Sequence, residues 1–175
     1  MSDPAVAIRR FIGAYPPDTQ AQVQTLVQDN RLAPYLAQKY PGRHDIQTDA
    51  ALYDYVQSLK QQYLKTAPPV HKVVWHAKLD VMHKVLGLHT AISRVQGARL
   101  KAKAKAEIRI AGLFKDAAPE FLEMVVAHEL AHLRERAHNK AFYQLCRHIQ
   151  PHYHQVEFDL RLLLLKRSLD ERPAP

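Results

Sequence analysis

Residues 119–142 read PEFLEMVVAHELAHLRERAHNKAF, and this stretch decides the fold that we expect for the chain. It contains His128-Glu129-Leu130-Ala131-His132, which is the pattern HExxH. Two histidines four residues apart on a helix point to the same side, so both imidazoles can reach one metal ion. Zinc accepts nitrogen ligands at about 2.0–2.1 Å. Glu129 would then stand beside the ion, where a carboxylate can take a proton from water.

Histidine is common in this chain, so a chance match has to be considered. With 11 histidines among 175 residues, about 0.03 accidental HExxH matches are expected. The stretch also has the features of a helix, with Pro119 and Glu120 at its start and Arg134 and Arg136 near its end. Apolar residues lie on more than one side, which predicts a helix buried in the core. A core helix with incidental histidines would leave these polar groups without partners, at considerable cost.

His138 is the natural third zinc ligand, because zinc enzymes usually keep three protein ligands and leave a fourth position for water. Six residues separate it from His132, which is about 9 Å along a continuous helix and too far for a shared ion. We therefore expect the helix to end near residues 134–137 and the chain to turn back. Asn139 is a good N-cap for a second helix, which would leave His138 in the corner between the two helices.

Three pieces of the sequence resemble the YgjP-like metallopeptidases, which are zincins related to the SprT-like and Spartan-type proteases. The pieces are LGLHTAISRVQG at 86–97, KAEIRIAGLF at 105–114 and HELAHLRERAHNKAFYQL at 128–145. The resemblance implies a zinc-dependent metallopeptidase that hydrolyses peptides or proteins, with one Zn²⁺ ion held by His128, His132 and His138 and with Glu129 as catalytic base. The spacing also equals the metzincin pattern HExxHxxGxxH, but Glu135 stands at its glycine position. That departure argues against a metzincin.

Two assignments stay open at the expected site: the third metal ligand and the group that stabilises the oxyanion. Glu157 lies 25 residues beyond His132, where thermolysin-like enzymes have a carboxylate ligand, so it could replace His138 as the third ligand. A further group would stabilise the oxyanion as water attacks a carbonyl. The candidates for that role are His148, His152, His154, Tyr143 and Tyr153.

The rest of the chain predicts an α+β fold of the zincin type in a single domain, 1–175, with a helical N-terminal part (1–66) and a catalytic core (67–170). Helices are expected at 4–14, 19–30, 32–40, 50–65 with Asp49 as its cap, 139–149 and 156–169. Val70–His76 predicts a strand. Residues 88–95 and 99–111 predict a hairpin, so we expect a small, mainly antiparallel sheet.

The expected strand Arg99–Ala111 alternates small apolar residues with charged ones, which is the period of a strand. Its cationic face, Arg99–Arg109, fits either a solvated sheet edge that resists association or a surface that aligns a substrate beside the active site. The net charge of +8 and the pI of about 9.6 favour acidic peptides or proteins that sit on nucleic acid. A nucleic-acid-associated module with a structural zinc, and a protease acting on DNA-bound proteins, are therefore the alternative functions.

The single cysteine, Cys146, excludes an intrachain disulfide and fits a reducing cytoplasm. Its apolar neighbours predict a buried thiol on a helix. The N-terminus lacks the pattern of a signal peptide, and no apolar run approaches 18 residues. We therefore expect a cytoplasmic protein that does not enter a membrane.

Overall fold

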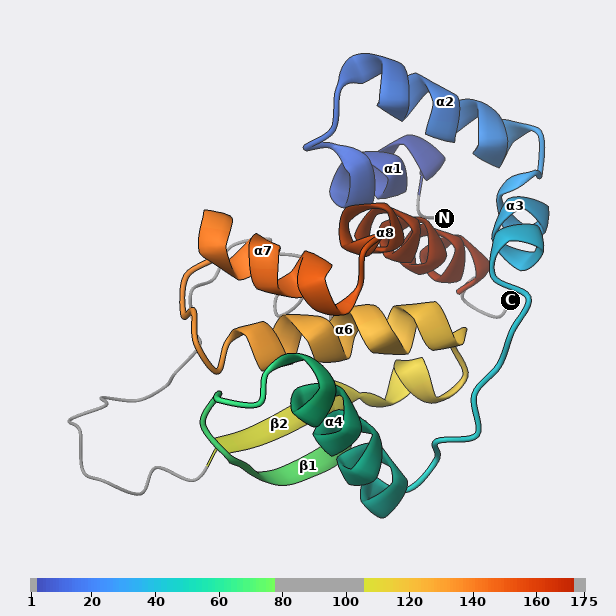
Figure 1. Ribbon diagram of the computed structural model, residues 1–175. Helices are drawn as coiled ribbons and strands as arrows, with labels where there is room; N and C mark the ends of the chain where they lie inside the picture. Colours follow the sequence, from blue (N-terminus) through green and yellow to red (C-terminus); the bar gives the residue numbers. More distant parts are fainter. Residues whose placement is uncertain (1–2, 78–105, 172–175) are drawn as a thin grey trace. The chain divides into compact units, whose positions relative to one another are not determined.

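The computed structural model describes residues 3–77 and 106–171, and Figure 1 labels its helices and strands. The chain divides into two compact units, of which the first is Met1–Gly42 with His154–Pro175 and the second is Arg43–Tyr153. Both units contain fully buried apolar side chains, such as Ile12 in the first and Leu130 in the second. Within the described residues, no helix is both long enough and apolar enough to span a membrane.

Helices alone form the described part of the first unit: α1 (Pro4–Ile12), α2 (Pro17–Gln28), α3 (Leu32–Lys39) and α8 (Tyr153–Asp170), whose first residue, Tyr153, belongs to the second unit. Gly13 is the C-cap of α1, and a side chain would not fit there, because a Cβ would lie 2.3 Å from the carbonyl oxygen of Arg9. Asn30 follows α2 with a φ of 54°, a left-handed conformation that asparagine tolerates. The bounds of α1, α2 and α3 lie within two residues of the predicted ones, whereas α8 begins three residues earlier than predicted.

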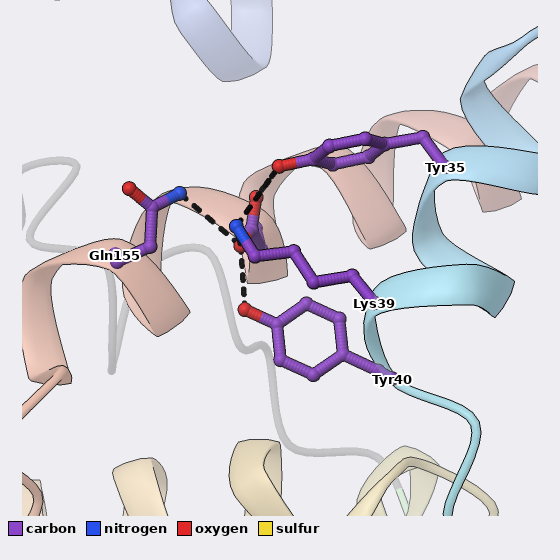
Figure 2. A network of polar contacts seen from close by, with 5 residues as sticks. Tyr35, Lys39, Tyr40 and Gln155 are labelled. Carbon is purple, nitrogen blue, oxygen red and sulfur yellow. Dashed lines mark hydrogen bonds and ion pairs between the residues drawn. The ribbon is translucent and has the colours of Figure 1, made fainter.

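A buried carboxylate connects α3 to α8 within the first unit (Figure 2). Asp159 is fully buried, and it accepts hydrogen bonds from the hydroxyls of Tyr35 at 3.1 Å and Tyr40 at 2.5 Å. The Gln155 amide donates to it at 3.2 Å, and the Lys39 ammonium lies 2.7 Å away. Burial alone would lower the pKa of Lys39, but its hydrogen bonds to Asp159 and Tyr35 raise it above the ordinary lysine value. We call these five residues the Asp159 cluster.

The second unit combines helices with a small sheet, so the α+β class is supported. Its elements are α4 (Asp49–Tyr63), β1 (Val70–His76), β2 (Ala106–Ala111), η1 (Gly112–Lys115), α6 (Pro119–Ala131) and α7 (Lys140–Ile149). Helix α4 lies against β1, while α6 contacts both β2 and α7 (Figure 1). Helix α6 is therefore in contact with both the sheet and the other helix that carries site residues.

The two described strands are parallel, with Val73 opposite Ile108 and Trp75 opposite Ile110. The prediction of a mainly antiparallel sheet is therefore wrong for the described part of the chain. Parallel strands need a connection of a dozen or more residues, and the long segment between β1 and β2 supplies it. The predicted hairpin of 88–95 with 99–111 lies outside the described residues, except for the end of its second arm, which forms β2.

Side chains of α4 hold this helix against β1. Thr48, rather than Asp49, caps α4, because its hydroxyl accepts a backbone N–H of the first turn at 3.1 Å. Asp49 instead accepts the backbone N–H of Trp75 at 2.8 Å. The Gln57 amide donates to the carbonyl oxygen of Val70 at 2.9 Å. Strand β1 is therefore hydrogen-bonded to α4 near both of its ends. Its bounds are the predicted ones.

Candidate metal centre

Helix α6 carries the HExxH pattern in the second unit. Pro119 occupies its first position, as predicted, and the helix ends at Ala131 rather than near residues 134–137. Most residues of α6 are buried, and His128 is only 2% exposed. This burial agrees with a sequence that is apolar on more than one side of the helix. The first histidine of the pattern therefore lies in the protein interior.

The chain turns directly after α6, where His132 is the C-terminal cap. The carbonyl oxygen of Ala131 accepts the N–H of Glu135 at 3.0 Å. Glu135 makes this turn without a left-handed backbone, since among the described residues other than glycine only Asn30 has a positive φ. A glycine is therefore not required at this position, which explains how the chain can depart from the metzincin pattern here.

Asn139 fixes the return of the chain into α7. Its side-chain oxygen accepts the N–H of Phe142 at 2.9 Å and caps the helix, as predicted. Its amide nitrogen donates to the carboxylate of Glu135 at 3.2 Å, which ties the cap to the turn. His138 consequently lies in the corner between α6 and α7.

The imidazoles of His128, His132 and His138 meet at their Nε2 atoms, and we call these residues the histidine cluster. His132 Nε2 lies 3.2 Å from His128 Nε2 and 3.1 Å from His138 Nε2. Two nitrogens bound tetrahedrally to one zinc ion would be about 3.3–3.4 Å apart. The three donors thus have the separation that a shared divalent ion needs. Among the described residues, 3–77 and 106–171, these three histidines form the group of histidine, cysteine or carboxylate side chains that lie close enough together to hold one ion.

A hydrogen bond shows which ring nitrogen of His132 carries a proton. Its Nδ1 lies 2.9 Å from the carbonyl oxygen of Glu135, and a carbonyl oxygen can only accept. Nδ1 therefore carries a proton, and when the ring is neutral its lone pair is on Nε2. This lone pair faces the two other Nε2 atoms at 3.1 and 3.2 Å. Such an arrangement is favourable when a cation or a proton lies between the nitrogens.

Exposure changes across the histidine cluster, from buried His128 through half-buried His132 to exposed His138. His138 is exposed as a whole residue, yet the pKa of its ring is lowered below the ordinary value. Partial burial of the ring is the larger cause, and the neighbouring His132 is the smaller one. A lowered pKa favours the neutral imidazole, which is the form that binds metal ions. Solvent therefore reaches the cluster at His138.

Phe142 packs against all three histidines. The side chain is fully buried, and its ring centre lies 4.9 Å from that of His128, 4.6 Å from that of His132 and 4.7 Å from that of His138. An aromatic ring in contact with each imidazole limits their rotation and excludes water from that side. The chain from His138 into α7 thus supplies both a candidate metal ligand and the apolar ring that packs against it.

The remaining predicted site residues occupy several environments. Glu129, the predicted base, is half-buried on α6 next to His128. Glu157, the alternative ligand, lies on α8, where its carboxylate is 3.8 Å from the guanidinium of Arg161.

The five oxyanion candidates do not form one group. Tyr153 is fully buried, and its hydroxyl lies 2.8 Å from Nδ1 of His128, the ring nitrogen that is not part of the cluster of Nε2 atoms. The Tyr143 ring centre is 6.3 Å from that of His138. His148 and His152 are exposed, and His154 belongs to the first unit.

Two supporting contacts of the histidine cluster were missed from the sequence. One is the carbonyl oxygen of Glu135 on His132, and the other is the hydroxyl of Tyr153 on His128. A backbone carbonyl carries no sequence signal, so only the turn geometry reveals it. Tyr153 was singled out, but for the oxyanion. The sequence alone could not suggest its contact with His128 Nδ1, because that contact depends on the path of the chain from α7 to α8.

Comparison with known proteins identifies the class to which this site belongs. A family model described as "YgjP-like, metallopeptidase domain" matches residues 74–162, which include α6, α7 and the whole histidine cluster. The chain belongs to the YgjP-like family, and the resemblance seen in the sequence is confirmed.

Among curated proteins, the chain is similar to the "UTP pyrophosphatase" of Escherichia coli (strain K12). The two are 53% identical over 161 residues, which cover 92% of this chain and 95% of that protein. No solved structure matches the chain. The family description and the name of this relative point to two different bonds for hydrolysis, a peptide bond and a phosphoanhydride bond.

Proposed function

We propose that this chain is a metal-dependent hydrolase that cleaves a phosphoanhydride bond of a nucleoside triphosphate, with UTP as the first substrate to test. The observation that carries the hydrolase is the approach of three Nε2 atoms, from His128, His132 and His138, to 3.1–3.2 Å along the cluster. These three side chains would hold one divalent ion, with zinc as our first choice because it favours imidazole ligands in a tetrahedral site. Bound zinc supplies Lewis-acid chemistry, which lets water lose a proton near neutral pH.

Glu129 is the residue of this chain that handles the proton. It follows His128 directly on α6 and is half-buried, which is the position of the glutamate in the HExxH pattern. Its role is to accept a proton from the attacking water. Water oxygen then bonds to the α-phosphorus, the bond to the bridging oxygen breaks, and pyrophosphate leaves with the negative charge. Glu129 can return its proton to the leaving group.

The substrate class rests on the relative and on charge. Identity of 53% over nearly the full length of both proteins makes a shared substrate class the simplest expectation. The turn and the start of α7 also carry three exposed cations, Arg134, Arg136 and Lys140, which stand between or beside the ligands His132 and His138 in the sequence. Exposed positive charge favours the approach of a polyanion such as a triphosphate.

Hydrolysis of peptide bonds is the second candidate function. The family description, a metallopeptidase domain, favours it, and the same histidines and Glu129 would serve. Glu129 would then pass its proton to the leaving amine. A protein substrate bound to nucleic acid belongs to this candidate, because the basic segment Arg99–Arg109 would face the nucleic acid; most of that segment lies outside the described residues.

The test compares the wild type with Glu129→Gln, both loaded with zinc, on UTP, on other nucleoside triphosphates and on a panel of peptides. Release of pyrophosphate and cleavage of peptides are measured together with metal content. Removal of a general base should lower the rate by about 10²–10⁴-fold while the metal stays bound. Glu123→Gln is the matched control, since Glu123 is another half-buried glutamate of α6.

Each result selects one function. Pyrophosphate release that depends on Glu129 supports the proposal, whereas peptide cleavage without pyrophosphate release selects the second candidate. A zinc-loaded protein that hydrolyses neither, but binds DNA with an affinity that falls steeply with salt, would indicate a structural metal in a nucleic-acid module.

A further inference from the structure

Tyr153 makes a contact with the histidine cluster that neither candidate reaction uses. Its side chain is fully buried, and its hydroxyl lies 2.8 Å from His128 Nδ1. His128 is itself only 2% exposed. Water therefore has little access to this nitrogen, and the tyrosine hydroxyl is the group that satisfies it.

The backbone holds Tyr153 in this position. The N–H of Tyr153 donates to the carbonyl oxygen of Gln150 at 2.9 Å, and the N–H of His152 donates to the side-chain oxygen of Gln150 at 2.9 Å. Gln150 is buried as well, so a fixed turn leads from the end of α7 to Tyr153. The aromatic ring of Tyr143 lies 6.1 Å from that of Tyr153. The hydroxyl is thus presented by a structured corner and not by a free chain end.

Hydrogen bonding at one ring nitrogen decides what the other nitrogen can do. A neutral imidazole with the proton on Nδ1 has a lone pair on Nε2, and the reverse tautomer has none there. For His132, the carbonyl oxygen of Glu135 selects the first tautomer. For His128, the tyrosine oxygen can accept the Nδ1–H bond, and Nε2 then faces Nε2 of His132 at 3.2 Å as a donor to metal.

We propose that Tyr153 is a positioning residue for the metal: it accepts the hydrogen bond from Nδ1 of His128, selects the metal-binding tautomer and fixes the ring orientation. The inference rests on the proposed function in so far as both need a metal ion at the histidine cluster. Its role differs from that expected from the sequence, where Tyr153 was a candidate for contact with the substrate. Groups behind a metal-binding histidine typically raise metal affinity by about 10–100-fold.

The test measures the zinc dissociation constant of the wild type and of Tyr153→Phe by competition with a chromogenic chelator. Tyr153→Phe keeps the ring and removes one oxygen, and we expect it to weaken zinc binding by about 10–100-fold. Tyr63→Phe is the control, since Tyr63 is a half-buried tyrosine of α4 in the same unit, with its ring 5.4 Å from that of His148. This control should keep the wild-type affinity.

A second readout follows the ring nitrogens by NMR in ¹⁵N-histidine-labelled protein loaded with zinc. In the wild type, His128 should show the tautomer with its proton on Nδ1, and that proton should exchange slowly with water. In Tyr153→Phe the exchange should become faster. This measurement separates a role at His128 from a general loss of stability, which thermal unfolding of the metal-free proteins records.

Equal zinc affinity and equal exchange in the wild type and Tyr153→Phe would overturn the inference, as would an equal loss in Tyr63→Phe. None of these readouts needs a substrate. A protein that binds zinc tightly and cleaves neither UTP nor peptides therefore contradicts the proposed function alone. A loss of affinity confined to Tyr153→Phe supports the positioning role in either case.

Discussion

The two units each contain a polar cluster within helices, and the two clusters are built in opposite ways. In the Asp159 cluster, one buried carboxylate receives Tyr35, Tyr40, Gln155 and Lys39 as donors. Acceptor and donors are matched within the protein. In the histidine cluster, three nitrogens of the same kind face one another at 3.1–3.2 Å. Their hydrogen-bonding partners, the Glu135 carbonyl and the Tyr153 hydroxyl, contact the opposite ring nitrogens of His132 and His128.

This difference separates a structural cluster from a binding site. A matched cluster stabilises the fold, because its charge is neutralised and its lone pairs are occupied. A cluster of like nitrogens 3.1–3.2 Å apart instead matches the spacing of ligands around one positive ion. The contrast predicts that substitutions in the histidine cluster change metal binding, and that substitutions in the Asp159 cluster change stability.

The largest effect is expected for His132→Ala, which removes the central member of the histidine cluster. If a binding free energy of about 12 kcal/mol is shared by three ligands, each contributes about 4 kcal/mol, so the zinc dissociation constant should rise by about 1000-fold. Calorimetric titration with zinc measures this. Zinc at 100 times its dissociation constant should also stabilise the wild type by about 2.7 kcal/mol, and this gain should be absent in His132→Ala.

His71→Ala is the control for this prediction, because His71 is an exposed histidine of β1. It should bind zinc as the wild type does. An unchanged zinc affinity in His132→Ala would remove the distinction between the clusters, since it would mean that the three nitrogens do not share an ion.

A smaller effect, on stability alone, is expected for Asp159→Ala. Two tyrosine hydroxyls and an amide lose a charged acceptor, while Lys39, with 36% of its side chain exposed, can turn to solvent. The unfolding free energy should fall by about 3 kcal/mol, as measured by urea denaturation. Asp170→Ala is the matched control on the same helix. Its carboxylate is 61% exposed and pairs with Lys166, so the loss should stay below about 0.5 kcal/mol.

Zinc affinity should not change in Asp159→Ala. If Asp159→Ala lowered both the unfolding free energy and the zinc affinity, the two clusters would be coupled, and the distinction between a structural cluster and a metal-binding cluster would be wrong.

Much of the helical fold was predictable, because local signals set helix ends. Proline at the start of α1 and α6 and the Asn139 cap of α7 act within one turn of the chain. The pairing of strands is a long-range property, and here sequence reasoning failed. A mainly antiparallel sheet was expected, whereas the described strands β1 and β2 pair in parallel across a long connection. Strand periodicity predicts which residues form a strand but not the direction of its partner.

The site shows the same division between local and distant signals. HExxH and the spacing to His138 led to three histidines that do come together, since helix geometry and one turn determine their positions. The Asp159 cluster was not predicted. Its members join residues 119 and 124 apart in the sequence, Tyr40 and Tyr35 with Asp159, and such contacts depend on the path of the whole chain. Both tyrosines donate to a buried charge, and no local sequence pattern indicates this.

The smallest effect is expected from Lys39 and depends on pH. Its folded-state pKa is raised by the hydrogen bonds to Asp159 and Tyr35, which outweigh the opposing effect of burial. A group whose pKa is raised on folding contributes stability below its unfolded pKa, about 10.4 for lysine, and loses that contribution as pH rises through the folded pKa. Screening by solvent should keep the contribution below about 1 kcal/mol.

The measurement is the difference in unfolding free energy between the wild type and Lys39→Met from pH 8 to pH 11. Subtraction removes the titration of groups common to both proteins. The difference should be constant near pH 8–9 and should shrink above about pH 10.4, because the wild type loses the charge that Asp159 attracts. Lys166→Met, at the surface pair with Asp170, controls for the loss of any lysine charge. If the difference in unfolding free energy grew with pH, the charged form of Lys39 would destabilise the Asp159 cluster. The charge of Asp159 would then not be neutralised by Lys39, and the contrast with the histidine cluster would be lost.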